Sequence, residues 1–162
     1  MKTLLVLRHA KSSWANATCP DVERPLNERG KRDAPRMGRL LADESLVPDA
    51  IVSSTAVRAR ATSEAVAITA GFGGEIRLAD ELYAADASDY IGCIRAWPDT
   101  ERRVLIVGHN PTVEELIQYL TGEDERMPTA ALAQISLDVE RWADLEPDGN
   151  GRLINLWRPR DL

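Results

Sequence analysis

Two histidines stand just beyond the ends of two hydrophobic runs, and they are the only histidines among 162 residues. His9 follows the run Leu4–Leu7 and one arginine, and His109 follows the run Val104–Val107 and one glycine. Short runs rich in leucine and β-branched residues, bounded by polar residues or glycine, indicate buried strands of a parallel sheet. Ligands of open α/β sheets bind beyond the carboxyl ends of such strands. Both imidazoles are therefore expected to face one crevice.

Arginines and helix starts are predicted at the same place. Arg8 directly precedes His9, and Arg58 falls in the first turn of the helix expected after the run at residues 50–53. Guanidinium groups and helix N-termini both suit phosphate oxygens. Nearby positive charge lowers the pKa of an imidazole, so one histidine can stay neutral and attack phosphorus. Its second ring nitrogen is expected to donate to a backbone carbonyl or to water. The pattern thus predicts phosphoryl transfer, in which the other site residues compensate the phosphate charge.

Three segments of the chain, taken in order, resemble the motifs of the histidine phosphatase superfamily, also called the phosphoglycerate mutase-like fold. The segments are Arg8-His9-Ala10, Ser53-Ser54-x-x-x-Arg58-Ala59 and Gly108-His109-Asn110-Pro111. Two segments, of which the first extends the Arg8-His9-Ala10 motif, are similar to the short bacterial SixA-type phosphohistidine phosphatases. They are Arg8-His9-Ala10-Lys11-Ser12-Ser13-Trp14 and Arg24-Pro25-Leu26-Asn27-x-x-Gly30. The resemblance covers essentially the whole chain, and its motifs are specific in combination.

The resemblance implies a role for each matching residue. His9 would be the nucleophile that forms a phosphohistidine intermediate, and Arg8, Arg58 and His109 would complete the phosphate pocket. The superfamily's first motif usually ends in glycine, where this chain has Ala10. A methyl group at this position is a mild departure, and we expect no loss of activity from it.

The general acid and the outer contacts are less strongly indicated. Many relatives carry a carboxylate on a segment before the second histidine, and Glu81 is the candidate here, with Asp80 behind it. SixA-type members lack a clear proton donor there, and a protonated imidazole leaving group departs more easily than an alkoxide, so the chemistry permits its absence. Lys11 and Ser12 offer further hydrogen bonds to phosphate, or simply belong to a polar loop. Trp14 either walls the entrance or packs over that loop.

The elements that must position these residues alternate between strand and helix. Strands are expected at residues 3–7, 50–53, 75–78, 103–107, 132–139 and 152–157, and helices at 27–44, 56–70, 87–97 and 110–120. Turn-forming residues occupy 146–151. This order predicts a three-layer α/β/α fold of the phosphoglycerate mutase-like type, with a mostly parallel sheet and an antiparallel edge. We expect residues 1–162 to form a single histidine phosphatase domain.

Helix ends carry their own signals. Asn27 is a plausible N-cap, and Gly71 closes the following helix. Pro35 lies inside the first helix and should kink or divide it. Asn110, followed by proline, is expected to cap the last helix, and Thr112 with Glu115 fits a capping box.

The charge balance, the length of the apolar stretches and the spacing of the cysteines disfavour several classes of protein. The formal net charge is −6, which argues against a nucleic-acid partner. Residues 1–60 nevertheless hold 11 Lys and Arg against 7 Asp and Glu, so a positive crevice is expected near the first histidine. No apolar stretch reaches bilayer length and no signal peptide is visible. Cys19 and Cys93 lack CxxC spacing and are interpreted as free thiols in a reducing cytoplasm.

The lead hypothesis is a phosphatase for phosphohistidine on a phosphorelay or phosphotransfer protein, since the short chain leaves little sequence for a lid. A phosphatase of small phosphate esters, such as sugar or nucleotide phosphates, shares the site and stays an alternative. A mutase is disfavoured because it needs a closed site. A non-catalytic phosphate-binding or scaffold protein would have lost a site residue. No cofactor is expected because nucleotide-binding glycine motifs are absent, and zinc is disfavoured because paired ligand spacing is absent.

Overall fold

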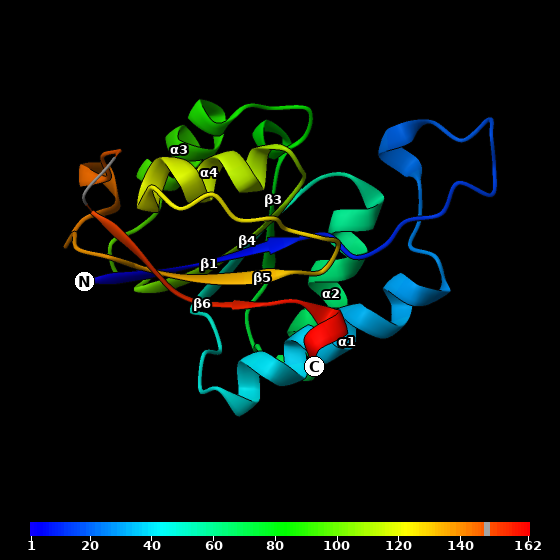
Figure 1. Ribbon diagram of the computed structural model, residues 1–162, viewed down its shortest axis with the longest axis horizontal. Helices are drawn as coiled ribbons and strands as arrows, with labels where there is room; N and C mark the ends of the chain where they lie inside the picture. Colours follow the sequence, from blue (N-terminus) through cyan, green and yellow to red (C-terminus); the bar gives the residue numbers. More distant parts are fainter. Residues whose placement is uncertain (148–149) are drawn as a thin grey trace.

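The computed structural model describes residues 1–147 and 150–162. A six-stranded sheet runs through the molecule in the order β3-β2-β4-β1-β5-β6 (Figure 1). The strands are β1 (Lys2–Arg8), β2 (Ala50–Ser54), β3 (Ile76–Ala79), β4 (Arg103–Gly108), β5 (Leu132–Leu137) and β6 (Gly151–Trp157). The first four strands are parallel, whereas β5 pairs antiparallel with both β1 and β6. The predicted mostly parallel sheet with an antiparallel edge is confirmed.

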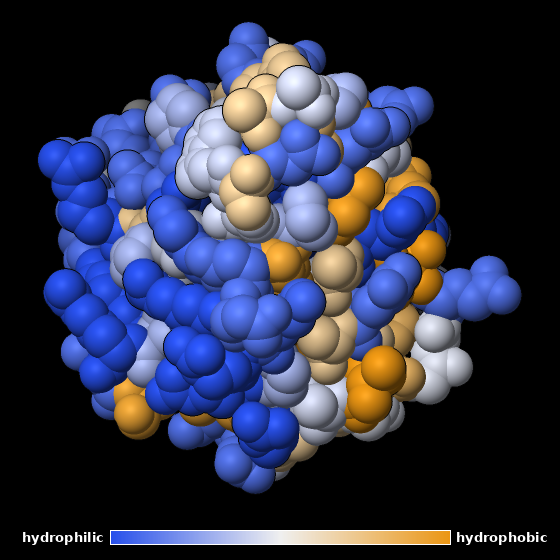
Figure 2. All heavy atoms as spheres, turned by 90° about the vertical axis from the view of Figure 1, so that its right-hand side faces the viewer, coloured by the Kyte–Doolittle hydropathy of each residue, from blue (hydrophilic) through white to orange (hydrophobic). Residues whose placement is uncertain are grey.

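Helices cover both faces of the sheet. In Figure 1, α1 (Glu28–Asp43) and α2 (Val57–Ala70) lie on one face, and α3 (Ala87–Arg95) and α4 (Thr112–Thr121) lie on the other. Shorter 3-10 helices occupy the connections: η1 (Asp21–Glu23), η2 (Asp80–Leu82), η3 (Trp142–Asp144) and η4 (Pro159–Asp161). The three-layer α/β/α architecture is therefore confirmed. Figure 2 looks onto the end of the molecule where β1 finishes, and hydrophilic residues cover much of this face. Within the described ranges, no helix combines the length and apolar character that crossing a bilayer requires.

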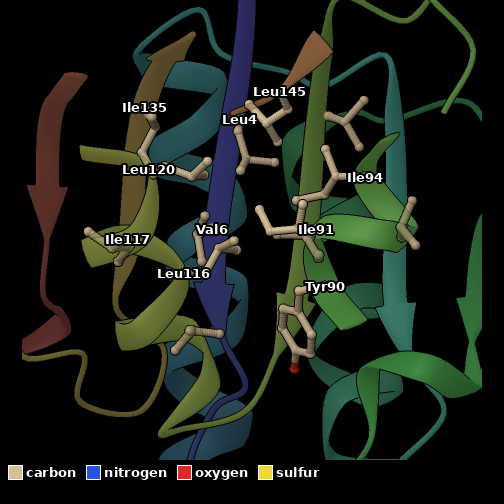
Figure 3. Close-up of a cluster of buried hydrophobic side chains, with 14 of the residues drawn as sticks. Leu4, Val6, Tyr90, Ile91, Ile94, Leu116, Ile117, Leu120, Ile135 and Leu145 are labelled. Carbon is tan, nitrogen blue, oxygen red and sulfur yellow. The ribbon is translucent and has the colours of Figure 1, made fainter. Parts of the chain in front are cut away.

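Alternate residues of β1 point into the two helical layers. Leu4 and Val6 join a buried cluster with α3 and α4, whereas Leu5 and Leu7 join a second cluster with α1 and α2. Figure 3 shows the first cluster. All four side chains are fully buried, and each such burial stabilises the fold by about 1.5–3 kcal/mol. Burial on both faces explains why the hydrophobic runs are continuous and not alternating.

Two glycines allow α1 to lie close to its neighbours. A Cβ atom at Gly38 would overlap the Thr69 side chain of α2, and one at Gly30 would overlap the backbone of Lys11. The backbone N–H of Asn27 donates to the Lys11 carbonyl at 3.0 Å. The first turn of α1 therefore holds the loop that follows β1. This loop, residues 11–26, builds one wall of the crevice described below.

The predicted helix ends are confirmed in part. The Asn27 side chain accepts the Gly30 N–H at 2.9 Å, and Gly71 ends α2 in the left-handed region, with φ 78°. Pro35 does not divide the first helix, because α1 is one element of 16 residues packed against α2. Several boundaries move by one or two residues: β3 begins at residue 76, β5 ends at 137 and α3 ends at 95. Of the predicted turn at 146–151, residues 148 and 149 lie outside the described residues.

The predicted capping of the last helix is wrong. Thr112 is the first residue of α4, and its hydroxyl donates to the Ala85 carbonyl at 2.6 Å, so it forms no capping box with Glu115. The Asn110 side-chain amide donates to Glu114 Oε2 at 2.9 Å and caps nothing. Both side chains are occupied by hydrogen bonds to other parts of the chain, so neither caps the helix.

Candidate active site

Three adjacent strands end at one edge of the sheet and bring the predicted residues together. β1 and β4 pair in a register that sets Arg8 beside Gly108, and the two histidines follow at the next position. The ring centroids of His9 and His109 are 5.0 Å apart. Arg58 enters from the first turn of α2, just after β2. These two arginines and two histidines line one crevice of about 320 Å³.

His9 is buried and held in one tautomer. Its Nδ1 lies 2.8 Å from the carbonyl oxygen of Ala10. Because a carbonyl can only accept, Nδ1 carries the hydrogen and Nε2 keeps the lone pair, as the sequence predicts. Burial is the main cause that lowers the pKa of His9 to about 3, and the positive charges of His109 and Arg58 act in the same direction. The imidazole is therefore neutral near pH 7, as a nucleophile must be.

His109 is anchored by two neighbouring elements. Its Nε2 lies 2.8 Å from Ser54 Oγ at the end of β2, and its backbone N–H donates to the Tyr90 hydroxyl at 3.2 Å. Burial above all, and then Arg58, lowers the pKa of His109 to about 4. A Cβ atom at Gly108 would overlap the Tyr90 ring. The glycine before this histidine is thus required by packing.

The two arginines are buried to different extents, and their hydrogen bonds to protein atoms use only some of their N–H groups. Arg8 Nη1 donates to the Met127 carbonyl at 3.1 Å, and its buried Nε–H has no partner among the described residues. Burial lowers the pKa of Arg8, whereas Glu114 acts in the opposite direction. Arg58 is only 7% exposed and donates to the backbone carbonyl of Asp21 at 2.7 Å. Two such guanidinium groups in one hollow attract an anion.

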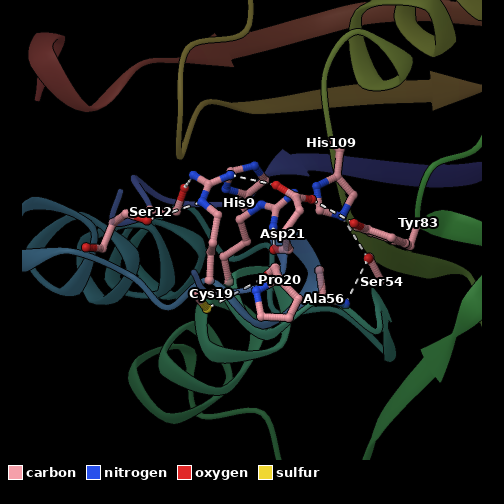
Figure 4. A network of polar contacts seen from close by, with 12 residues as sticks. His9, Ser12, Cys19, Pro20, Asp21, Ser54, Ala56, Tyr83 and His109 are labelled. Atoms are coloured by element: carbon pink, nitrogen blue, oxygen red, sulfur yellow. Dashed lines mark hydrogen bonds and ion pairs between the residues drawn. The ribbon is translucent and has the colours of Figure 1, made fainter. Parts of the chain in front are cut away.

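A carboxylate of the loop completes the wall of the crevice. Asp21 Oδ2 accepts from the Tyr83 hydroxyl at 2.7 Å and from Arg58 Nη2 at 3.0 Å, and Oδ1 accepts from Arg24 Nη1 at 2.8 Å. The bond from Tyr83 is the largest cause that holds the pKa of Asp21 well below its usual range. Figure 4 shows Asp21 beside His9, with Tyr83, the residue that follows η2, reaching toward it. Sequence reasoning missed Asp21 and Tyr83, because 62 residues separate them and no periodicity links them.

The loop also positions the outer residues. Lys11 and Ser12 line the crevice, as the sequence predicts, but the Ser12 hydroxyl already accepts a hydrogen bond from Arg24. The Arg24 guanidinium stacks 3.4 Å from the centroid of the Trp14 ring, which is 72% exposed. Trp14 therefore both walls the entrance and packs over the loop.

Comparison with known proteins decides the family. A sequence model of the histidine phosphatase superfamily (branch 1) matches residues 4–96. The chain belongs to the histidine phosphatase superfamily. An uncharacterized protein of Mycobacterium tuberculosis is 34% identical, over 95% of this chain and 100% of its own length. A 2,3-bisphosphoglycerate-dependent phosphoglycerate mutase of Leifsonia xyli is 30% identical, over 90% of this chain and 57% of its own length.

Two solved structures place this histidine phosphatase among the SixA-type members. A protein of Agrobacterium tumefaciens assigned as SixA has a TM-score of 0.83 and 34% identity, covering 98% of this chain and 99% of its own. A second, from Nakamurella multipartitia, has a TM-score of 0.86 and 28% identity, covering 98% and 96%. The family and the fold thus agree with the sequence, and they make phosphate hydrolysis the class of activity.

Glu81 does not take part in the crevice of this histidine phosphatase. It is exposed on η2, is absent from the crevice lining and faces Cys93 on α3, where it contributes to raising the pKa of that thiol. Burial is the main cause of that rise, to about 11. The 3-10 helix turns Glu81 away and presents Tyr83 instead. This position does not fit the general acid predicted from sequence.

Another hollow, of about 580 Å³, is larger but carries the wrong charge for phosphate. Its lining includes Glu114, Glu115, Asp124 and Glu125 against a single arginine. Among residues 1–147 and 150–162, no cluster of three or more His, Cys, Asp or Glu is arranged to hold a metal ion. Both cysteines are free thiols. The crevice at the strand ends is therefore the candidate active site.

Proposed function

We propose that this histidine phosphatase hydrolyses phosphohistidine on a protein of the phosphorelay or phosphotransfer type, through a covalent intermediate at His9. The observation that carries the proposal is the state of His9: neutral, buried, with Nε2 free and Nδ1 bonded to Ala10. Arg8, Arg58 and His109 stand in the same crevice. A fixed, unprotonated imidazole among cationic groups is what nucleophilic attack on a phosphoryl group requires.

Two steps follow from this arrangement. In the first, His9 Nε2 forms a bond to phosphorus while the bond to the leaving group breaks, and Arg8, Arg58 and His109 stabilise the charge on the phosphoryl oxygens. In the second, water attacks phosphorus, inorganic phosphate leaves and His9 regains its lone pair. The two guanidinium groups supply the charge compensation that metal ions supply in other phosphoryl-transfer sites, and the neutral His109 adds a hydrogen bond. We therefore propose a metal-independent reaction, carried out by one domain.

The choice of a protein substrate rests on the shape of the entrance and on the relatives. Trp14 lies exposed at the rim, which supports this choice because its ring can contact a protein that presents its phosphohistidine to the crevice. The solved relatives of 28% and 34% identity are both assigned as phosphohistidine phosphatases. Hydrolysis of small phosphate esters is the second candidate, because the crevice volume is in the range of small-molecule sites and phosphoglycerate mutases are among the relatives.

Replacement of His9 tests the proposal. His9→Ala is expected to lower turnover of both a chromogenic phosphate ester and a phosphohistidine protein by about 10³-fold or more, because the nucleophile is lost. Brief mixing of the unaltered enzyme with ³²P-labelled substrate, followed by an alkaline denaturing quench, should trap label on the chain, and His9→Ala should trap none. Unchanged rates for both substrates would defeat the proposal. A chain that binds phosphate without ever becoming labelled would be the scaffold protein.

A further inference from the structure

The crevice has a buried floor and a half-exposed carboxylate at its rim. His9 and Arg58 are 6% and 7% exposed, whereas the Asp21 side chain is 50% exposed. Arg58 donates to Asp21, so a single guanidinium group links the buried floor of the crevice to the carboxylate at its rim. In phosphoryl transfer the attacking and leaving atoms lie roughly in line through phosphorus. A group displaced by the buried His9 therefore departs toward the rim, where Asp21 stands.

The partners of Asp21 keep it ionised and leave it able to accept one more hydrogen bond. Arg24 and Arg58 can only donate, and the Tyr83 hydroxyl donates to Oδ2. These bonds hold the pKa of the carboxyl well below its usual range, so Asp21 has no proton to give near pH 7. A carboxylate oxygen has two acceptor positions. Among the described residues, Oδ1 accepts only from Arg24, so one position remains.

We propose that Asp21 is a specificity-determining residue whose Oδ1 accepts the N–H of the protonated imidazole of a substrate phosphohistidine. The proposal rests on the proposed function and concerns its leaving group. When His9 Nε2 bonds to phosphorus, the substrate's P–N bond breaks and its electron pair returns to the ring nitrogen. The ring keeps the proton on its other nitrogen and leaves as neutral imidazole. No proton donor is consumed, and water then releases phosphate from His9.

The same carboxylate disfavours ordinary esters. An alkoxide must gain a proton as it departs, and the ionised Asp21 holds none. A substrate with its own carboxylate beside the phosphate would also be repelled at the rim. The position of Glu81 outside the crevice agrees with this chemistry, since a cationic nitrogen leaving group needs an acceptor and not an acid.

The variant Asp21→Asn tests the proposal on two substrates. One is a histidine peptide phosphorylated with phosphoramidate, and the other is p-nitrophenyl phosphate, whose leaving group carries no N–H and needs no proton. The neutral amide cannot stabilise the charged ring, so kcat/KM for the peptide is expected to fall about tenfold at pH 8. In the pH profile of kcat/KM for the peptide, the alkaline limb should also move down by about one pH unit. The profile for p-nitrophenyl phosphate is expected to keep its shape.

Two further variants separate this role from a structural one. Glu23→Gln removes the same charge from the exposed face of η1, outside the crevice lining, and should leave both profiles unchanged. Tyr83→Phe removes one donor from Asp21 Oδ2 and keeps the charge, so Asp21 becomes a stronger acceptor and the alkaline limb for the peptide should move slightly up, opposite to the shift of Asp21→Asn. Equal losses on both substrates with unaltered pH profiles would overturn the proposal and leave Asp21 as a positioning residue for Arg58. Failure of the unaltered enzyme to cleave the peptide while it cleaves the ester would instead overturn the proposed function.

Discussion

The two buried imidazoles link stability to pH at the scale of single residues. Burial is the main cause that lowers the pKa of His9 to about 3 and of His109 to about 4, from an ordinary value of 6.5. In the unfolded chain both rings titrate near 6.5, so between pH 6.5 and 4 the unfolded state binds more protons than the folded state. Stability is therefore fully present above pH 6.5 and is lost as the pH falls.

This linkage predicts the acid sensitivity of each histidine. Between pH 6 and pH 5, each should reduce the free energy of unfolding by about 1 kcal/mol, because one pKa unit corresponds to about 1.4 kcal/mol. Urea unfolding of the unaltered chain and of His109→Gln, at both pH values, measures the contribution of one ring. The variant should lose about 1 kcal/mol less between the two conditions. Identical losses would contradict a neutral His109 in the folded chain.

At the scale of elements, two glycines set the position of α1, because the absence of a side chain at each allows close contact with a neighbouring segment. Gly38 lies where any Cβ would overlap Thr69 on α2, and Gly30 lies equally close to the loop after β1. Since that loop carries the crevice wall, the helix pair and the site are mechanically connected. Gly92, in the exposed middle of α3, has open space around its Cα.

These glycines predict opposite effects of the same substitution. Gly38→Ala should destabilise the fold by about 1–3 kcal/mol, because the added methyl overpacks the contact between α1 and α2. Gly92→Ala should stabilise it by about 0.5–1 kcal/mol, because alanine loses less backbone entropy in a helix and meets nothing. Thermal and urea unfolding of both variants provide the measurement. A Gly38→Ala chain as stable as the unaltered one would show that the helices can separate without cost.

The elements could be predicted from sequence where one physical cause dominates. The strands β1, β2 and β4 are buried on both faces, so their apolar runs are continuous and easily recognised. The cap at Asn27 can be predicted because its hydrogen bond is local. The cap at Asp86, which forms a capping box with Asp89, is missed by the usual sequence pattern, since aspartate stands where glutamate is usual three residues on.

The residues of the candidate site likewise divide into those that the sequence predicts and those that it does not. Histidines and arginines that follow strand ends or helix starts are placed by topology, which explains why the sequence alone predicts that four of them share one crevice. The hydrogen bond from Tyr83 to Asp21 depends on how an irregular loop folds over the edge of the sheet. It also depends on the 3-10 helix η2, after which Tyr83, and not Glu81, faces the crevice. Side-chain contacts between distant loops leave no trace in hydrophobic periodicity.

At the scale of the whole molecule, a chain of net charge −6 places three arginines, Arg8, Arg24 and Arg58, along one crevice. Arg8, Arg58 and two imidazoles lie there, whereas the larger hollow along α4 is lined mostly by carboxylates. Such an arrangement directs a small anion to the strand ends and away from the rest of the surface. Any anion that binds only the folded chain must also stabilise it.

Inorganic phosphate is therefore expected to raise the melting temperature in a concentration-dependent manner. At about 100 times its Kd the added stability should be about 2.7 kcal/mol, and the gain should shrink at high ionic strength. Arg58→Ala should abolish the phosphate-induced rise. Arg60→Ala, two residues along the same helix, should preserve it, because Arg60 is exposed and pairs only with Glu64, at 3.9 Å, in the part of the chain that the structure describes. Differential scanning calorimetry in phosphate and in chloride of equal ionic strength makes the comparison. If both variants kept the full rise, phosphate would be binding somewhere other than the crevice.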